Sequence, residues 1–305
     1  MSKPSWSASV LPSPSMSSVA LVTCSELPDL DEDDRLIAPA LAALGIDAVP
    51  AVWSDPAVDW AAFDLVVLRN PWDYTDRLAE FLAWARAVPR LANPVDVVAW
   101  NTDKRYLGEL AGAGLPVVET AFVAPGEAVP AFDREVVAKP TVSAGSRDTE
   151  RFLPTDRDAL LAHVTHIHSS GRTAMLQPYL DRVDEAGETA LLHVGGAYSH
   201  AIRKGPLLTA DRAMVGDLYV EEDISPREPT AAERDAAAAI MAEVRRRFGD
   251  LLYARVDLLI GDDGAPVLLE LELTEPSLFL GTAAGAPERF AAAIAAAATG
   301  ARPAR

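Results

Sequence analysis

The sequence predicts an α/β fold with more than one subdomain, and three observations support this. The 305 residues exceed the length of most single domains. Apolar strands alternate with helical segments over 18–100, an order typical of a parallel sheet. Farther along, two aliphatic segments at 253–260 and 267–273 flank the turn sequence GDDG, which predicts an antiparallel hairpin. A parallel sheet followed by a separate antiparallel region is therefore expected.

The composition is typical of a globular protein and argues against several classes of partner. Hydrophobic residues make up 50% of the chain and charged residues 24%, as in ordinary globular proteins. The net charge of −18 argues against nucleic acid or an anionic membrane as the main partner, because both require a basic surface. No apolar segment approaches the roughly twenty residues of a membrane span. The single cysteine, Cys24, excludes an internal disulfide and is typical of the reducing cytoplasm, where we place the protein.

The N-terminal α/β domain is expected over 18–100. The segment 1–17 before it is rich in serine and proline and lacks the hydrophobic core of a signal peptide, so we predict a disordered tail. Met16 directly precedes the first predicted strand, which leaves Met1 and Met16 as possible starts. Strands are predicted at 19–23, 46–53 and 63–68, with a helix that ends at Gly45 after the first.

The sequence RNPWDYTDR follows the third of these strands. Open α/β sheets bind ligands at the carboxyl ends of their strands. Arg69, Trp72, Asp73 and Tyr74 are therefore candidates for a substrate pocket, with a packed aromatic loop as the alternative.

A helix is predicted to begin at Asn101 or Thr102, its candidate caps, and to end at the sequence GAGLP. Lys104 falls in the first turn, where a lysine is unfavourable against the helix dipole. A bound anion would explain this lysine, because helix amino ends favour phosphates. A solvent-exposed lysine is the alternative.

A second lysine, Lys139, closes a strand predicted at 135–139, which follows another strand at 117–123. The loop after it, TVSAGSRDT, consists of small and hydroxylated residues whose backbone amides could approach phosphates. A hairpin turn is the alternative for this loop.

The middle of the chain continues with a helix at 154–169 and a strand at 174–180. The helix carries three histidines without matching ligands, so we interpret them as a polar face. The strand is interrupted by Pro178 and could present Gln177 and backbone groups to a flat heterocycle such as adenine.

Two strands at 188–192 and 198–203 follow, and the second ends in the adjacent cations Arg203 and Lys204. This pair could contact a phosphate group, or it could be surface charge, and the sequence supports both interpretations equally. A helix at 230–248 begins with the capping pair Thr230 and Glu233. The last predicted helix spans 287–298.

The hairpin at 253–273 carries three carboxylates, Asp257, Glu270 and Glu272. Glu270 and Glu272 share one strand face, and antiparallel pairing can bring Asp257 beside them. Three carboxylates on one face repel one another unless a cation lies among them, and Mg²⁺ prefers such oxygen ligands together with phosphates. Arg255 lies on the same strand face as Asp257. We therefore predict a metal–phosphate site, with a solvated polar face as the alternative.

The order of these features resembles the ATP-grasp superfamily of carboxylate–amine ligases, over about 101–276. An α/β domain in front is also typical of that superfamily. The resemblance implies two subdomains, 101–180 and 181–305, that clasp ATP between them. It implies that Lys104 and Lys139 contact the phosphates under a mobile loop at 141–146.

The resemblance also implies roles for further residues. The nucleotide would be bound by Thr141, Ser143, Gly145, Ser146, Gln177, Tyr179, Leu180 and Glu188, with Asp184 and Glu185 as rivals of Glu188 for the ribose. Asp257, Glu270 and Glu272 would hold two Mg²⁺ ions, for which Mn²⁺ could substitute. The superfamily usually has Glu-x-Asn where this chain has Glu270-Leu-Glu272, which adds one negative charge. Arg255 and Arg203 would be the catalytic residues.

Four segments, VLRNPWDY, WNTDKRYL, SHAIRKGP and LLELELTEP, resemble the bacterial group that contains O-ureido-D-serine cyclo-ligase, the ring-closing enzyme of D-cycloserine biosynthesis. This implies an ADP-forming ligase that activates the carboxylate of an amino-acid-like substrate as an acyl phosphate for attack by an amine, within one molecule in the case of ring closure. A small-molecule kinase and a non-catalytic ATP-binding protein are the alternatives. A homodimer is the default oligomeric state.

Overall fold

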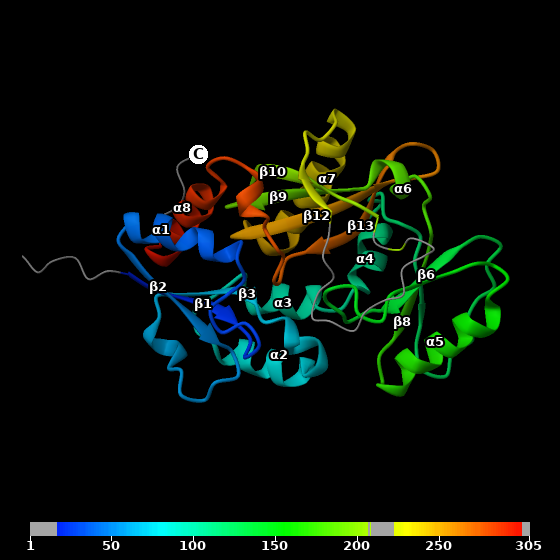
Figure 1. Ribbon diagram of the computed structural model, residues 1–305. Coiled ribbons are helices and arrows are strands. Elements are labelled where there is room, and N and C mark those ends of the chain that lie inside the picture. Colours follow the sequence, from blue (N-terminus) through cyan, green and yellow to red (C-terminus); the bar gives the residue numbers. More distant parts are fainter. Residues whose placement is uncertain (1–16, 207, 209–222, 301–305) are drawn as a thin grey trace, which may run out of the picture.

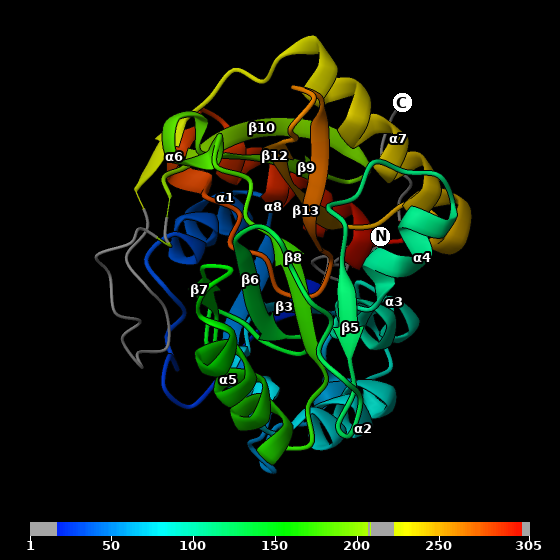
Figure 2. The same ribbon diagram turned by 90° about the vertical axis from the view of Figure 1, so that its right-hand side faces the viewer.

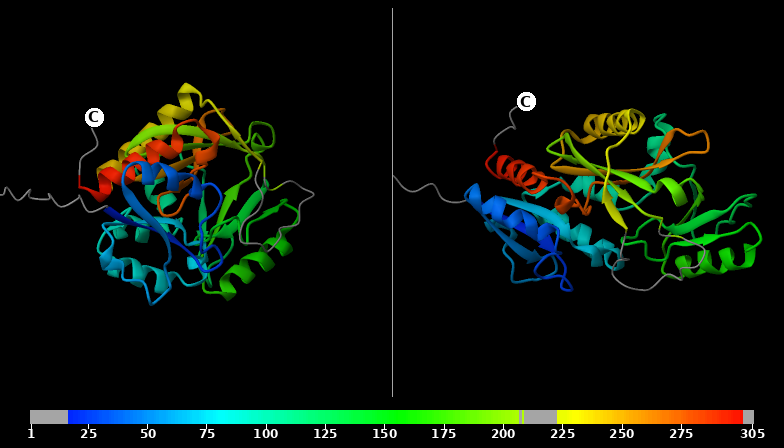
Figure 3. Two further views of the ribbon diagram at one scale, coloured as in Figure 1. Left: turned by 60° about the vertical axis from the view of Figure 1, so that its left-hand side comes forward. Right: turned by 45° about the horizontal axis from the view of Figure 1, so that its top comes forward.

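The structure is a computed structural model that describes residues 17–206, 208 and 223–300 (Figure 1). The tail expected at 1–17 lies outside these residues, except for Ser17, which begins the first strand. Three sheets form the fold. The first lies at one end and the second at the other, and the third extends above both (Figures 1 and 3).

The first sheet is parallel and has the strand order β2-β1-β3-β4. Its strands are β1 (Ser17–Thr23), β2 (Ile46–Val52), β3 (Leu65–Asn70) and β4 (Leu91–Ala92). Helices α1 (Ile37–Ala43), α2 (Leu78–Ala87) and α3 (Val95–Asn101) accompany it. Successive residues of β1 enter cores on opposite faces, Val19 with α1 and Ala20 with α2. A sheet covered on both faces explains the continuous apolar strands of this region.

The last helix, α8 (Ala286–Ala298), returns to this first sheet from the far end of the chain. Its residues Phe290 and Ile294 share a core with Val19 and Leu21 of β1. Figure 3 shows α8 beside α1. The same core includes Leu192 and Ile202 of the third sheet, so the C-terminal helix packs between the first and third sheets.

The second sheet is antiparallel, with the order β5-β8-β6-β7, and α5 packs on it (Figure 2). Its elements are β5 (Ala121–Val123), β6 (Val136–Pro140), β7 (Glu150–Phe152), α5 (Arg157–Ser169) and β8 (Ala174–Pro178). The strand predicted at 117–123 is shorter than expected, because Val117 instead forms an isolated bridge with Leu268 of the third sheet.

The third sheet has the order β11-β10-β9-β12-β13, with every pairing antiparallel. It comprises β9 (Glu188–Val194), β10 (Ala197–Lys204), β11 (Ile224–Pro226), β12 (Tyr253–Ile260) and β13 (Pro266–Glu272), with α6 (Val183–Ala186) before it. Helix α7 (Ala231–Phe248) packs on one face and begins with the predicted capping box of Thr230 and Glu233. The predicted hairpin is confirmed as β12 and β13.

The helix predicted from Asn101 is wrong at its start. Asn101 instead ends α3, and the next helix, α4, spans Tyr106–Gly112. The side-chain amide of Asn101 donates to the carbonyl oxygen of Leu271 (2.8 Å) and accepts from the amide of Leu273 (2.7 Å), so it joins α3 to β13 rather than capping a helix. Lys104 consequently lies in the connection between two helices, and the helix-dipole argument does not apply to it.

None of the helices in the described residues combines the length and the apolar character that crossing a membrane requires.

Candidate functional site

A cavity of about 540 Å³ is lined by residues from all three sheets and their connections. This volume lies within the usual range for small-molecule sites. Its lining is rich in charge. Among the described residues, the acids are Asp31, Glu32, Asp33, Glu188, Asp257, Glu270, Glu272 and Glu275, and the bases are Lys104, Lys139, Lys204 and Arg255. The bases gather around the hairpin of β12 and β13, whereas the end formed by the N-terminal domain presents acids and the aromatic rings of Trp72 and Tyr74.

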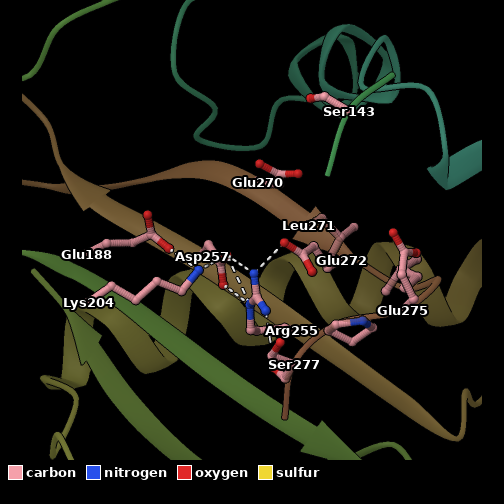
Figure 4. A network of polar contacts seen from close by, with 12 residues as sticks. Ser143, Glu188, Lys204, Arg255, Asp257, Glu270, Leu271, Glu272, Glu275 and Ser277 are labelled. Atoms are coloured by element: carbon pink, nitrogen blue, oxygen red, sulfur yellow. Dashed lines mark hydrogen bonds and ion pairs between the residues drawn. The ribbon is translucent and has the colours of Figure 1, made fainter. Parts of the chain in front are cut away.

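The register of the hairpin determines how its charged side chains meet. Asp257 pairs with Glu270, and Arg255 pairs with Glu272. The guanidinium of Arg255 bonds both Asp257, at 2.9 Å from Nε to Oδ1, and Glu272 (Figure 4). Lys204, at the end of β10, places Nζ 3.0 Å from Asp257 Oδ2 and 2.9 Å from Glu188 Oε1. Strands β9, β10, β12 and β13 thus contribute one connected cluster of charges.

Two lysines from outside the third sheet bind Glu270. Lys104 Nζ lies 3.1 Å from Glu270 Oε1, and Lys139 Nζ lies 3.6 Å from its Oε2. Lys104 Nζ also donates to the carbonyl oxygen of Ser143 at 2.7 Å. Glu270 and Lys104 therefore connect the hairpin to the small-residue loop after β6.

Burial and neighbouring charges lower the pKa of some carboxyl groups in the cluster and raise the pKa of others. Burial favours the neutral form of Asp257 and Glu270, but adjacent cations outweigh it, and the pKa of each lies below its usual value. For Glu188 and Glu272, burial dominates and raises the pKa to about 7, against the opposing effects of Lys204 and Arg255 respectively. Burial also lowers the pKa of Lys139. The cations therefore hold Asp257 and Glu270 in the ionised form, whereas burial opposes ionisation of Glu188 and Glu272.

The predicted metal ligands are not preassembled around a metal position. Within the described residues, no three His, Cys, Asp or Glu side chains are arranged to hold a metal ion. Asp257, Glu270 and Glu272 are instead bound to Lys204, Arg255, Lys104 and Lys139. Their chemistry nonetheless suits a hard divalent ion, because they are oxygen donors on one cavity wall. Binding would require them to exchange side-chain cations for the metal.

The structure gathers most of the other predicted site residues at this cavity. Its lining includes Lys104, Lys139, Ser143, Gly145, Ser146, Gln177, Tyr179, Leu180 and Glu188. Thr141 is buried beside the cavity and does not line it, and its carbonyl oxygen accepts from the amide of Lys104 at 2.8 Å. The rivals Asp184 and Glu185 lie outside the lining, and Asp184 accepts a hydrogen bond from the hydroxyl of Tyr179.

The structure places Arg203, which was predicted to be catalytic together with Arg255, outside the cavity lining. Arg203 Nε donates to the carbonyl oxygen of Ala186 at 3.1 Å. Its neighbour Lys204 lines the cavity, because successive side chains of a strand point to opposite faces. Arg203 and Lys204 are adjacent in the sequence, and the pairing of β10 within the third sheet determines which of the two side chains faces the cavity.

The loop after β3 contributes to the cavity only in part. Trp72 and Tyr74 line it, but Arg69 is fully buried and does not. Arg69 Nε lies 2.7 Å from Asp34 Oδ1, and Arg69 Nη2 donates to the carbonyl oxygen of Pro276 at 2.7 Å. Asp73 also turns away and accepts from the indole of Trp53. Arg69 and Asp73 are thus structural residues.

Sequence reasoning missed part of the lining. The missed residues include Asp31, Glu32 and Asp33 in the loop after β1, and Glu275, Ser277 and Phe279 after β13. The loop after β1 could have been found by the same rule that singled out the loop after β3, since both follow the carboxyl ends of parallel strands.

Comparison with known proteins agrees with this geometry. Residues 19–93 match the family model described as D-cycloserine synthetase DcsG, N-terminal domain. The chain is 40% identical over 299 residues to the cycloserine biosynthesis protein DcsG of Streptomyces lavendulae, covering 92% of this chain and 98% of that protein. The crystal structure of D-cycloserine synthetase DcsG superposes with a TM-score of 0.84 at 38% identity, covering 92% of this chain and 99% of the other.

More distant structures share the fold. A D-alanine–D-alanine ligase from Bacillus anthracis has a TM-score of 0.62 at 13% identity, with 93% of this chain and 97% of the other covered. A RimK-domain ATP-grasp protein from Sphaerobacter thermophilus has a TM-score of 0.62 at 21% identity, with coverages of 93% and 100%. With an ATP-grasp fold and 40% identity across nearly its whole length, the chain belongs to the D-cycloserine synthetase (DcsG) family.

Proposed function

We propose that this protein is an ATP-dependent, ADP-forming ligase that closes the ring of D-cycloserine from O-ureido-D-serine. The observation that carries the proposal is the cluster of alternating cations and carboxylates on one cavity wall. Lys104, Lys139, Lys204 and Arg255 supply positive charge for phosphate groups, and Asp257, Glu270 and Glu272 supply oxygen ligands for magnesium. A site for MgATP requires both.

In the proposed reaction, the substrate carboxylate accepts the γ-phosphoryl group of ATP and becomes an acyl phosphate. The substrate nitrogen that is bonded to oxygen then attacks the acyl carbon, which closes the ring and releases inorganic phosphate. Hydrolysis of the bond between this nitrogen and the carbamoyl carbon, with the carbamoyl group leaving as carbon dioxide and ammonia, gives D-cycloserine. Magnesium, when bound, would neutralise phosphate charge during the transfer. Intramolecular attack benefits from a high effective molarity, so the protein mainly has to orient one substrate and exclude water.

The chain's own residues supply the positioning. Lys104 would bind a phosphate oxygen while its contact with Ser143 holds the loop after β6 over the phosphates. Arg255, between Asp257 and Glu272, would stabilise the charge of the transferring phosphoryl group or of the acyl phosphate. Lys204 replaces Arg203 as the further cation on this wall.

The nucleotide would lie between the second and third sheets, that is, between the subdomains expected at 101–180 and 181–305. Gln177, Tyr179 and Leu180 lie where the chain passes from one to the other and would bind the adenine. Glu188 would bind the ribose in preference to Asp184, because Glu188 lines the cavity and Asp184 does not.

The test measures ADP release with MgATP and a panel of amino acids, short peptides and both enantiomers of O-ureidoserine, with product masses recorded. We expect ADP together with D-cycloserine from the D-enantiomer. ADP with a different condensed product would retain the ligase and exclude the cycloserine reaction. A phosphorylated product without a new C–N bond would indicate a kinase. ATP-dependent thermal stabilisation without ADP release from any compound would leave only nucleotide binding.

A further inference from the structure

Glu275 differs from the carboxylates of the charged cluster on β9, β12 and β13. Glu188, Asp257, Glu270 and Glu272 each have a lysine or arginine nitrogen within ion-pair distance. Glu275 forms no ion pair within the part of the chain that the structure describes, and its carboxyl is instead hydrogen-bonded to the hydroxyl of Tyr74. A cavity carboxyl bound to a phenol rather than to a cation is free to change its charge without breaking an ion pair.

The position of Glu275 is fixed by the N-terminal domain. Tyr74 belongs to the short 3₁₀ segment Trp72–Asp76, is buried, and stacks on Phe81 with ring centroids 4.8 Å apart. The carbonyl oxygen of Glu275 accepts from the indole of Trp72 at 3.4 Å. The carbonyl oxygen of Pro276 accepts from Arg69. These contacts hold the peptide after β13 against the first sheet.

Glu275 lies between the two ends of the cavity. On one side its carboxyl interacts electrostatically with Glu272, Lys104 and Glu270. These three residues belong to the cavity wall that carries the cations and carboxylates proposed to bind MgATP, which we call the phosphoryl-transfer wall. On the other side it contacts Tyr74 and lines the end formed by the N-terminal domain. Figure 4 shows Glu275 beside Glu272 along the segment that leads out of β13. An acyl phosphate formed at the wall would have its nucleophile near this position.

We propose that Glu275 is the proton acceptor for the attacking nitrogen of the substrate, and that Tyr74 is the positioning residue that orients its carboxyl. The inference rests on the proposed ligase function. In the step, the nitrogen's electron pair forms the C–N bond as the bond between the acyl carbon and the phosphate oxygen breaks. The bonding pair leaves with inorganic phosphate. The proton of the nitrogen passes to the carboxylate of Glu275 and from there to solvent.

The acidity of Glu275 suits this role. Burial, with a contribution from the charge of Glu272, raises its pKa to about 8, and the hydrogen bond from Tyr74 opposes that rise. A general base works best when its pKa lies near the working pH, because it is then both available and basic. An ordinary glutamate is a much weaker base at neutral pH.

The test separates activation of the carboxylate from the ligation step. Glu275→Gln keeps the size of the side chain and a partner for Tyr74, but it cannot accept a proton. We expect its rate of ring closure to fall about 100-fold or more with little change in KM for ATP or substrate. Acyl phosphate formation needs no proton acceptor, so trapping with hydroxylamine should still give hydroxamate and ADP at close to the wild-type rate. Glu288→Gln, the same change at an exposed position of α8, should retain both rates.

Tyr74→Phe supplies an independent readout. Loss of the hydrogen bond should raise the pKa of Glu275, so the pH profile of ring closure should move to higher pH, which a purely structural role would not produce. Ring closure by Glu275→Gln at the wild-type rate would overturn the proposal. Loss of hydroxamate formation in Glu275→Gln, with hydroxamate still formed by the wild type, would also overturn the proposal. The residue would then be needed before the ligation step. No hydroxamate from the wild type would instead show that the ligase proposal itself is wrong.

Discussion

Lys204 Nζ lies 3.0 Å from Asp257 Oδ2, and this contact joins the end of β10 to the middle of β12 inside the cavity. It shows which of two adjacent cations faces the cavity. Arg203, one residue earlier, bonds the carbonyl oxygen of Ala186 outside the cavity lining. The alternation of side chains along β10 therefore has a functional consequence that a pair of substitutions can measure.

We expect Lys204→Gln to lower ADP formation by about 10²–10³-fold, because it removes a preorganised cation from the phosphoryl-transfer wall. Arg203→Gln should reduce it far less, since that guanidinium does not reach the cavity. Both variants are assayed under saturating MgATP, with unfolding in urea measured in parallel. Equal losses in the two variants would contradict the assignment of Lys204.

Asp257 and Glu270 provide the second prediction. Asp257→Asn and Glu270→Gln keep side-chain size and remove one metal-binding charge each, so Mg²⁺-dependent turnover should fall by at least about 100-fold. Chelation should likewise abolish wild-type turnover, and added Mg²⁺ should restore it. Circular dichroism should show that both variants fold. Unchanged activity in both would exclude these carboxylates as metal ligands.

The third prediction concerns Arg69, which sequence reasoning proposed for the substrate pocket. Its guanidinium is fully buried and bonds Asp34, which is also buried. Arg69→Leu leaves the carboxylate of Asp34 without its cation, so we expect a loss of about 3–5 kcal/mol in the free energy of unfolding. Adding Asp34→Asn should restore part of that loss, because the uncompensated charge is then absent. Urea unfolding of the two single variants and the double variant measures the coupling.

Local patterns predicted the framework of the site. The turn GDDG and its aliphatic flanks predicted the hairpin, and strand alternation placed Glu270 and Glu272 on one face. Register then brought Asp257 opposite Glu270. Such inferences succeed because they depend on periodicity and turn chemistry within one short segment.

Other features depend on contacts between distant segments, which one sequence does not reveal. The helix expected at Asn101 fails because that side chain bonds the backbone of β13. Arg69 is structural because Asp34 and Pro276 surround it. Glu275 has no signal of its own in the sequence, since burial in the folded chain raises its pKa and its partner Tyr74 lies more than two hundred residues earlier. These are tertiary effects that override local preference.

The last prediction is a pH-dependent loss of stability at His193. This residue lies on β9, is buried, and has an Nδ1 atom without a hydrogen-bond partner among the described residues. Burial lowers the pKa of His193 to about 4, below the usual value near 6.5. Between about pH 4 and pH 6.5, the unfolded chain therefore binds a proton at His193 that the folded chain does not bind. Stability from this source is complete above pH 6.5 and declines as the pH falls toward 4.

At pH 5 the expected loss from His193 is about 2 kcal/mol relative to pH 7.5. Burial lowers the pKa of His200 as well, which acts in the same direction. Urea unfolding of the wild type and of His193→Gln at both pH values isolates the contribution, because the carboxyl groups and His200 are common to both proteins. The variant should lose about 2 kcal/mol less between pH 7.5 and 5. Identical pH dependence in the two proteins would mean that His193 takes up its proton equally well in the folded chain.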